Sequence, residues 1–150
     1  MERGTAGSVA RAFFDAYRAR DVEAMVAVCS ERAGFHYVPF EVWGKQRVLR
    51  GDGNVRGIGK VLWTGLIESF PDLTNEITSM HADDDGNVAV EATICGTQAK
   101  SWGAVDSRGR SFAVRHLFLL HVAHDGLIDQ ITAYWDSADF NRQLGRLEID

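Results

Sequence analysis

The stretch RSFAVRHLFLLHVAHDGLIDQITAYW, residues 110–135, decides the fold of this chain. Two segments, near 110–123 and 127–136, alternate apolar with polar residues or are rich in β-branched and aromatic ones, and HDG separates them. A period of two is typical of a half-buried strand, and Asp-Gly is a strong hairpin signal. The stretch therefore predicts a pair of antiparallel strands.

The turn between these strands sets which residues face each other. If the Asp-Gly pair at 125–126 forms a two-residue turn, His116 lies opposite Trp135. In the same register, Val122 lies opposite Asp129. One face of the pair then holds a mostly apolar set: His116, Phe118, Leu120, Ile131, Ala133 and Trp135. We predict that this face is a pocket wall with His116 as its main titratable group, although a three-residue turn with a bulge would break the register.

The order of the other elements indicates an α+β fold. Apolar residues at helical spacing predict two opening helices, the second capped by Asp21, and a third helix over roughly 57–69. Segments near 74–82 and 87–97 then add two strands to an antiparallel meander. We predict one domain over residues 1–150, with helices on one face of a curved antiparallel sheet that forms a cone around a hydrophobic pocket.

The segment between the second and third helices predicts one short strand and a long loop. GFHYVPF, residues 34–40, is aromatic and contains Pro39, which fits an edge or interrupted strand. Strand alternation allows only one of His36 and Tyr37 to point inward. Residues 39–56 are predicted to be a loop, long enough to be a lid or a binding loop.

Composition excludes several classes of protein. The 150 residues are 45% hydrophobic and 25% charged, as in an ordinary soluble domain. A net charge of −5 without a run of Lys or Arg argues against nucleic acid as a partner. No apolar segment fits a signal peptide or a membrane span, so we expect a cytoplasmic protein without a membrane partner. Cys29 and Cys95 fit neither a disulfide framework nor a metal site, and we expect both to be reduced in the core.

Three segments of the second half, GNVAVEATICGT, GRSFAVRHLFLL and DGLIDQITAYWDSADFNRQLG, resemble the SnoaL-like polyketide cyclase or ester cyclase family. In the first half, VARAFFDAYRARDVEAMVAV, VRGIG and SFPDLTNEI fall where that family places its helices and the turn into its sheet. The resemblance implies the cone-shaped fold of nuclear transport factor 2-like proteins, usually as a homodimer. It also implies a small hydrophobic molecule as the substrate and aldol ring closure without a cofactor.

The resemblance implies two catalytic positions, and this sequence fills neither. The aspartate that family cyclases carry in the last strand falls on Ala133, and the histidine of the neighbouring strand falls on Leu119. His116 lies three residues from that second place. Limonene-epoxide-hydrolase-like relatives carry an Arg and an Asp in the last strand, where this chain has Ile131 and Ala133. Epoxide hydrolysis by that route is therefore not expected.

Three residues are candidates for acid–base catalysis. His116 is the first, because the ordinary pKa of histidine, about 6.5, suits a general base near neutral pH. A buried, hydrogen-bonded core histidine is the alternative. His36 on the first strand and Asp129 near the hairpin tip are the others, with a solvated surface carboxylate as the alternative for Asp129. Asp136 and Asp139 are expected to cap the last helix.

Aromatic side chains are the predicted substrate contacts, because tryptophans can hold a flat polycyclic molecule by offset stacking. The predicted set is Phe14, Tyr17, Tyr37, Trp43, Trp63, Trp102, Phe118 and Trp135. A place in the hydrophobic core is the alternative for Trp63. Trp43 and Trp102 lie in predicted loops and are candidates for a pocket mouth or a dimer interface.

Three functions are compatible with these observations. The first is a cofactor-independent cyclase- or isomerase-like enzyme that moves a proton on a hydrophobic polycyclic or keto substrate. The second is a non-catalytic protein that binds a flat hydrophobic ligand, which Ala133 favours because it cannot transfer a proton. The third is a dimerisation module without a ligand.

Overall fold

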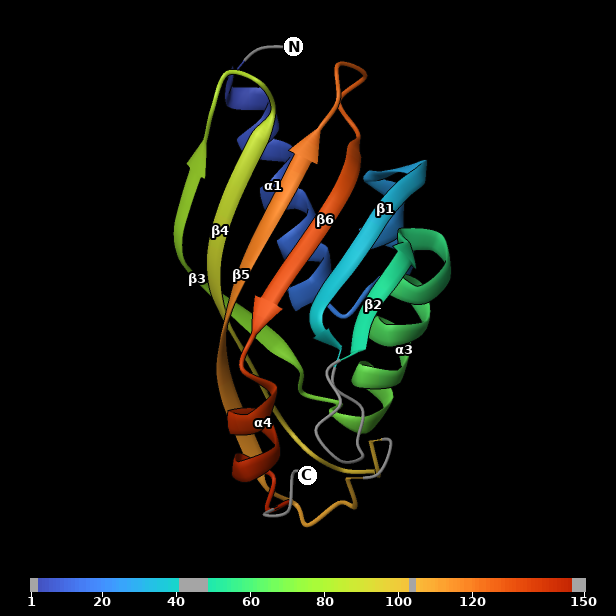
Figure 1. Ribbon diagram of the computed structural model, residues 1–150, viewed down its shortest axis with the longest axis vertical. Coiled ribbons are helices and arrows are strands. Elements are labelled where there is room, and N and C mark those ends of the chain that lie inside the picture. Colours follow the sequence, from blue (N-terminus) through green and yellow to red (C-terminus); the bar gives the residue numbers. More distant parts are fainter. Residues whose placement is uncertain (1–2, 41–48, 103–104, 147–150) are drawn as a thin grey trace.

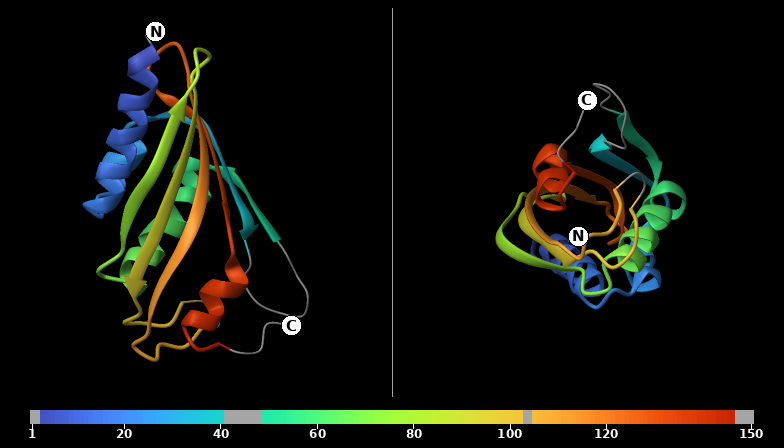
Figure 2. Two further views of the ribbon diagram at one scale, coloured as in Figure 1. Left: turned by 90° about the vertical axis from the view of Figure 1, so that its left-hand side faces the viewer. Right: turned by 90° about the horizontal axis from the view of Figure 1, so that it is seen from below.

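The computed structural model describes residues 3–40, 49–102 and 105–146. Its elements are, in order, α1 (Arg3–Arg18), α2 (Val22–Ala27), β1 (Cys29–Phe40), β2 (Leu49–Asn54), η1 (Val55–Gly59), α3 (Lys60–Ser69), β3 (Thr74–Ala82), β4 (Asn87–Thr97), β5 (Ser111–Val122), β6 (Ile128–Trp135) and α4 (Ser137–Gln143). The strands form one six-stranded sheet in the order β2-β1-β6-β5-β4-β3. The sheet is curved but does not close, and α1 and α3 cover its open side (Figures 1 and 2). The predicted α+β class is confirmed.

The β5–β6 pair has the predicted inner face but not the predicted turn. His116 lies opposite Trp135, as expected. Val122, however, pairs with Ile128 and not with Asp129. The turn is longer than two residues, and Asp129 is the extra residue of a bulge in β6. The longer turn and the bulge offset each other, and the predicted register is restored from His121 onward.

The first strand differs from its prediction. β1 is not an edge strand, because it lies between β2 and β6. It runs parallel to β6, with Tyr37 opposite Ala133, so the sheet is not wholly antiparallel. Pro39 falls where the pairing with β2 shifts between Tyr37 and Phe40. This irregularity accommodates a residue that has no N–H for the ladder.

The predicted loop over 39–56 is wrong in its last part. Residues 49–54 form β2, which pairs with β1 in an antiparallel sense. The sequence LRGDGN has few β-formers, so the partner strand and not local propensity decides this element. Residues 41–48, with Trp43, lie outside the described residues, and the prediction of a lid there remains a prediction.

Local polar groups set the ends of several helices. Asp21 Oδ1 accepts a hydrogen bond from the Ala24 N–H at 3.0 Å and caps α2 as predicted. Asp136 does the same for α4 through the Asp139 N–H at 3.0 Å. Asp139 does not act as a cap; its carboxylate accepts from Gln143 Nε2. The predicted third helix begins with the π-helical turn η1 and continues as α3.

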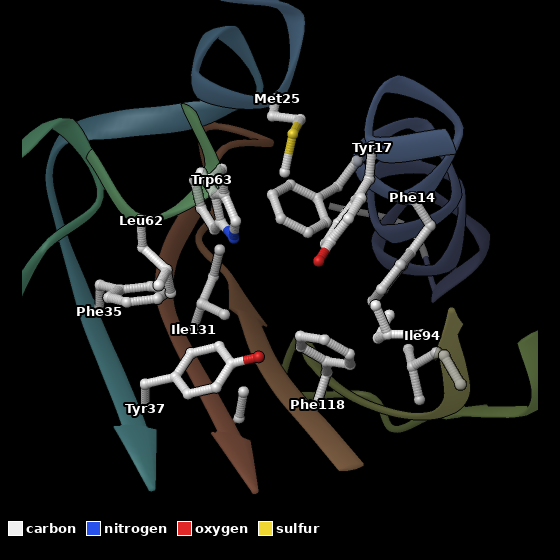
Figure 3. Close-up of a cluster of buried hydrophobic side chains, with 14 of the residues drawn as sticks. Phe14, Tyr17, Met25, Phe35, Tyr37, Leu62, Trp63, Ile94, Phe118 and Ile131 are labelled. Atoms are coloured by element: carbon white, nitrogen blue, oxygen red, sulfur yellow. The ribbon is translucent and has the colours of Figure 1, made fainter. Parts of the chain in front are cut away.

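The core lies between the sheet and the helices and is rich in aromatic rings. Figure 3 shows side chains from α1, α3, β1 and β5 that converge on one another. Trp63 contacts Phe13 and Phe35 edge-on, with ring centroids 5.5 and 5.3 Å apart. Edge-to-face contacts of this kind stabilise a fold beyond the area that they bury.

Two smaller predictions concern the cysteines and the membrane. Both cysteines are free, but only Cys29 is buried, whereas Cys95 is half-buried. The expectation that both lie in the core is therefore wrong for Cys95, because it falls on the alternate face of β4. Among the described residues, none of the helices has the length and apolar character needed to cross a bilayer.

Candidate active site

Three neighbouring strands bring Tyr37 and His116 together on the inner face of the sheet. Buried and exposed side chains alternate along most of β5, and His116 is one of those that point inward. Tyr37 points inward from β1. Between them, Ala133 of β6 pairs with Tyr37 on one side and Phe118 on the other. Tyr37 Oη lies 2.8 Å from His116 Nε2, which is a hydrogen bond between residues 79 positions apart.

The partners of His116 determine where its proton lies. Nδ1 is 3.1 Å from the Val114 carbonyl oxygen, which can only accept a hydrogen bond. Nδ1 therefore carries the hydrogen, and Nε2 presents its lone pair. The Tyr37 hydroxyl donates to that lone pair. In this arrangement a backbone carbonyl orients the imidazole where a carboxylate would do so in a catalytic triad.

Burial keeps both members of this pair neutral. Each residue is only 5% exposed. Burial lowers the pKa of His116 to about 4, although its hydrogen bond to Val114 acts in the opposite direction. Burial also raises the pKa of Tyr37 well above its ordinary value. The ordinary histidine pKa near 6.5, on which the sequence prediction relied, therefore does not apply to His116.

Aromatic rings form the walls around the pair. The His116 ring lies nearly parallel to Phe118 and Trp135, at interplanar angles of 12° and 17° with centroids 5.5 and 5.4 Å apart. Tyr37 meets His116 and Trp135 edge-on. Trp135 is half-buried, whereas the other three residues are buried. The hydrogen-bonded Tyr37–His116 pair is therefore enclosed by aromatic rings.

The structure does not bring the other two acid–base candidates to His116. His36 lies on the outer side of β1, where Nδ1 is 2.7 Å from the Asp52 carboxylate of β2. Asp129 lies at the bulge near the hairpin tip, and its carboxylate is 2.6 Å from His121 Nδ1. Strand alternation explains the position of His36, which neighbours the inward Tyr37 on β1. Asp129 points outward because of the bulge, since alternation from Ile131 and Ala133 alone would turn it inward.

The predicted substrate contacts fall into two groups. Phe118, Tyr37 and Trp135 surround His116, and Phe14 reaches this group through an edge contact with Phe118 at 5.0 Å. The second group packs around Phe13 and α3: Trp63 and Tyr17 meet Phe13, and Trp102 lies against Gly65 of α3. Tyr17 also points toward the interior that Tyr37 and Phe118 face (Figure 3), and it acts electrostatically on Tyr37. Trp43 is outside the described residues.

A groove of about 490 Å³ lies on the outer face of the sheet, near Ala89, Leu119 and Thr132. These positions are on the opposite side of the strands from His116. The groove is therefore separate from the Tyr37–His116 pair. In the described part of the chain, histidine, cysteine and acidic residues form no group of three or more that could hold a metal ion.

The family model of the SnoaL-like domain matches residues 10–131 of this chain. This chain belongs to the SnoaL-like family. A comparison with curated proteins finds none that matches it.

Solved structures of low sequence identity share the SnoaL-like fold. AclR, a proposed hydroxylase from Streptomyces galilaeus, is 18% identical with a TM-score of 0.79, over 98% of this chain and 89% of its own. A proposed polyketide cyclase from Xanthomonas campestris pv. campestris is 20% identical with a TM-score of 0.73, over 95% of this chain and 98% of its own. IdmH, a proposed polyketide cyclase from Streptomyces antibioticus, is 20% identical with a TM-score of 0.74, over 93% of this chain and 98% of its own.

The structure also corrects one SnoaL-like position that the resemblance implied. Leu119, where counting places the family histidine, is 42% exposed on the outer face of β5. It cannot be an interior position, because inward residues of β5 have even numbers. Ala133, by contrast, does lie on the inner face beside Tyr37. The position at which the resemblance implies a carboxylate is thus an interior alanine, and Tyr37 pairs with it across β1 and β6.

Sequence reasoning named Tyr37 and His116 separately but missed that they form a pair. The inward face of β5 was predicted from its alternation, whereas the choice between His36 and Tyr37 on β1 was left open. The pairing of β1 with β6 was not readable, since GFHYVPF carries no local mark of its partner strand. Only that pairing places the two side chains within hydrogen-bonding distance.

Proposed function

We propose that this SnoaL-like protein is a cofactor-independent enzyme that transfers a proton on a hydrophobic carbonyl compound, with Tyr37 and His116 as its acid–base pair. The observation that carries the proposal is the 2.8 Å hydrogen bond between Tyr37 Oη and His116 Nε2. This pair is polar, titratable and surrounded by aromatic walls on the inner face of the sheet. Membership of a family with cyclase-like structural relatives supports the same reaction class.

The hydrogen bond defines a relay of two protons. A proton leaves the carbon beside the substrate carbonyl for Tyr37 Oη, and the proton of that hydroxyl passes to His116 Nε2. The products are an enolate, a neutral tyrosine and an imidazolium. The low pKa of His116 opposes this transfer until the negative enolate forms beside it, because an adjacent anion favours the protonated ring.

The fate of the enolate would decide the overall reaction. If the relay returns the proton to a different carbon, the result is an isomerisation. If the enolate carbon attacks a second carbonyl group of the same molecule, a carbon–carbon bond closes a ring, and the proton on His116 returns through Tyr37 to the new alkoxide. Both reactions balance without an oxidant, a reductant or a cofactor.

A binding protein is the second candidate, and one observation favours it. No carboxylate contacts His116 among the described residues; its Nδ1 donates to the Val114 carbonyl, and Ala133 occupies the family's carboxylate position. A pair that stays neutral over most of the pH range could simply donate a hydrogen bond to a ligand carbonyl. Saturable quenching of tryptophan fluorescence without chemical change in the ligand would support this reading.

Deuterium exchange separates the two candidates. Polycyclic ketones and β-keto esters are incubated in D₂O with wild type, Tyr37→Phe, His116→Gln or buffer alone, and deuterium uptake is followed by mass spectrometry. We expect uptake with wild type and its loss in both variants. Tyr134→Phe is the matched control, because Tyr134 lies exposed on the outer face of β6 and should not affect uptake. Ligand binding without uptake would exclude the enzyme in favour of the binding protein.

We also propose that the outer face of the sheet joins two copies of this chain. Leu117 and Tyr134 pair across β5 and β6, and Leu119 lies beside them; all three are exposed. A cluster of large apolar side chains in the middle of a sheet supports contact with another protein surface. Leu119→Asp should lower the mass measured by light scattering from that of a dimer to that of a monomer. A monomeric wild type would exclude this proposal.

A further inference from the structure

The side chain of Gln98 carries a buried acceptor without a partner. Gln98 follows β4 with the parity of its buried residues and is itself 2% exposed. Three of its polar groups are engaged: the backbone N–H donates to the Arg110 carbonyl, the backbone carbonyl accepts from Ser107 Oγ, and Nε2 donates to the Val105 carbonyl at 2.9 Å. Oε1 is buried and has no hydrogen-bond partner within the described part of the chain.

The neighbours of Gln98 hold its amide in one orientation. The Val105 carbonyl oxygen also accepts a hydrogen bond from the Trp102 N–H at 2.9 Å, and it cannot donate. A flipped amide would place Oε1 against that oxygen, so Nε2 must face Val105 and Oε1 must face away. A second backbone hydrogen bond, from the Val105 N–H to the Trp102 carbonyl, also joins these two residues. Oε1 is therefore a pre-oriented acceptor.

A row of rings connects Gln98 with the Tyr37–His116 pair. Phe112 is the next inward residue beside Gln98, since it lies opposite Gly96 in the β4–β5 ladder. From Phe112 the contacts run to Phe140 at 4.8 Å, from Phe140 to Trp135 at 5.2 Å, and from Trp135 to His116 at 5.4 Å. Gln98 and the proposed acid–base pair thus lie at the two ends of one row of contacting rings.

An unpaired buried amide oxygen is costly and needs an explanation. The Val105 carbonyl already accepts from two donors, the Trp102 N–H and Gln98 Nε2, whereas the Arg110 carbonyl accepts from the Gln98 N–H. A single donor group of a ligand would satisfy the free Oε1 acceptor, while the rings beyond it would contact the apolar part of that ligand.

We propose that Gln98 Oε1 accepts a hydrogen bond from a hydroxyl or N–H group of the ligand, so that the protein selects flat aromatic molecules that carry such a donor. The inference rests on the proposed function, since it assigns a specificity-determining residue to the same interior site. The ligand's apolar body would lie along the rings between Gln98 and Trp135. The preferred ligands are thus phenols, enols or aromatic amides and not their methylated ethers or esters.

A pair of probes that differ in one donor tests this inference. The dissociation constants of 2-naphthol and 2-methoxynaphthalene are measured by tryptophan quenching for wild type and Gln98→Met. We expect wild type to prefer 2-naphthol by about tenfold, the change that one hydrogen bond of average strength produces. Gln98→Met should bind both probes about equally. Ser107→Ala is the matched control, because it removes a contact to the Gln98 backbone and leaves Oε1 in place.

The outcomes separate this inference from the proposed function. Equal binding of both probes by wild type, or a preference that persists in Gln98→Met, would overturn the role of Gln98 and leave the interior site intact. Quenching by neither probe would overturn the interior site and this inference with it. If Gln98→Met does not unfold cooperatively, Gln98→Asn tests the same point, because it keeps the amide but withdraws the oxygen by one methylene.

Discussion

His116 and His121 lie five residues apart on β5, and the fold treats them in opposite ways. His116 faces the interior, is 5% exposed, and has a pKa that burial lowers to about 4. The side chain of His121 faces outward and is 39% exposed. Its Nδ1 lies 2.6 Å from the Asp129 carboxylate and its Nε2 3.0 Å from the Asp85 carbonyl, and the hydrogen bond that it donates to Asp129 raises its pKa.

The difference shows that the face of the strand on which a histidine lies decides whether burial or polar partners set its pKa. Their positions differ by five, an odd number, so the two side chains face opposite sides of the sheet. His116 meets rings and one hydroxyl and stays neutral, as a proton relay requires. His121 meets acceptors at both nitrogens and links the hairpin of β5 and β6 to the turn of β3 and β4, beside the Val122 N–H to Gly86 carbonyl hydrogen bond.

The largest expected effect is a loss of stability at acidic pH that depends on His116. Unfolded histidine has a pKa of about 6.5, so the unfolded chain binds more protons than the fold between that pH and about 4. The free energy of unfolding therefore falls as the pH falls through this window, by about 3 kcal/mol in total. Urea unfolding of wild type and His116→Gln between pH 7 and 4 measures it, because carboxylates contribute equally to both. If the unfolding free energies of the two proteins fall equally with pH, the low pKa of His116 is contradicted.

Removal of the Tyr37 hydroxyl is expected to have the next largest effect. Tyr37→Phe leaves His116 Nε2 buried without a donor, which costs about 1–3 kcal/mol of unfolding free energy at pH 7. Tyr134→Phe is the control for the loss of a tyrosine hydroxyl, because Tyr134 is 44% exposed on the outer face of β6. Urea unfolding should rank the two variants in that order, and equal losses would show that the pair adds no stability.

A smaller effect is expected at the exposed histidine. The raised pKa of His121 means that its stabilisation is fully present below about pH 6.5 and is lost as the pH rises through the folded pKa. Asp129→Asn should return the pKa of His121 toward 6.5 in an NMR titration. Because the pair is well exposed, the loss of stability at pH 5.5 should stay below about 1 kcal/mol. An unchanged titration would mean that Asp129 does not set the charge of His121.

The smallest effect is expected at His36. Its contact with Asp52 joins β1 to β2 on the outer face, with both side chains partly exposed. His36→Gln should change the unfolding free energy by less than about 0.5 kcal/mol, as is usual for exposed ion pairs. It should also leave deuterium uptake unchanged in the exchange assay. A loss of uptake would return His36 to the list of acid–base candidates.

The sequence by itself determined the elements whose physics is local. The period-two pattern over 74–82, 87–97 and 110–135 predicted four strands and the inner face that carries His116, because alternation follows from strand geometry alone. The caps at Asp21 and Asp136 were also readable, since each carboxylate bonds a backbone N–H three residues away.

Tertiary structure alone decided how distant segments meet. The bulge at Asp129 depends on the longer turn, and β2 depends on its pairing with β1. The parallel pairing of β1 with β6 brings Tyr37 to His116 and places Tyr37 opposite Ala133. The pKa of His116 follows from the same packing, because it is set by burial among rings that come from three strands, β1, β5 and β6.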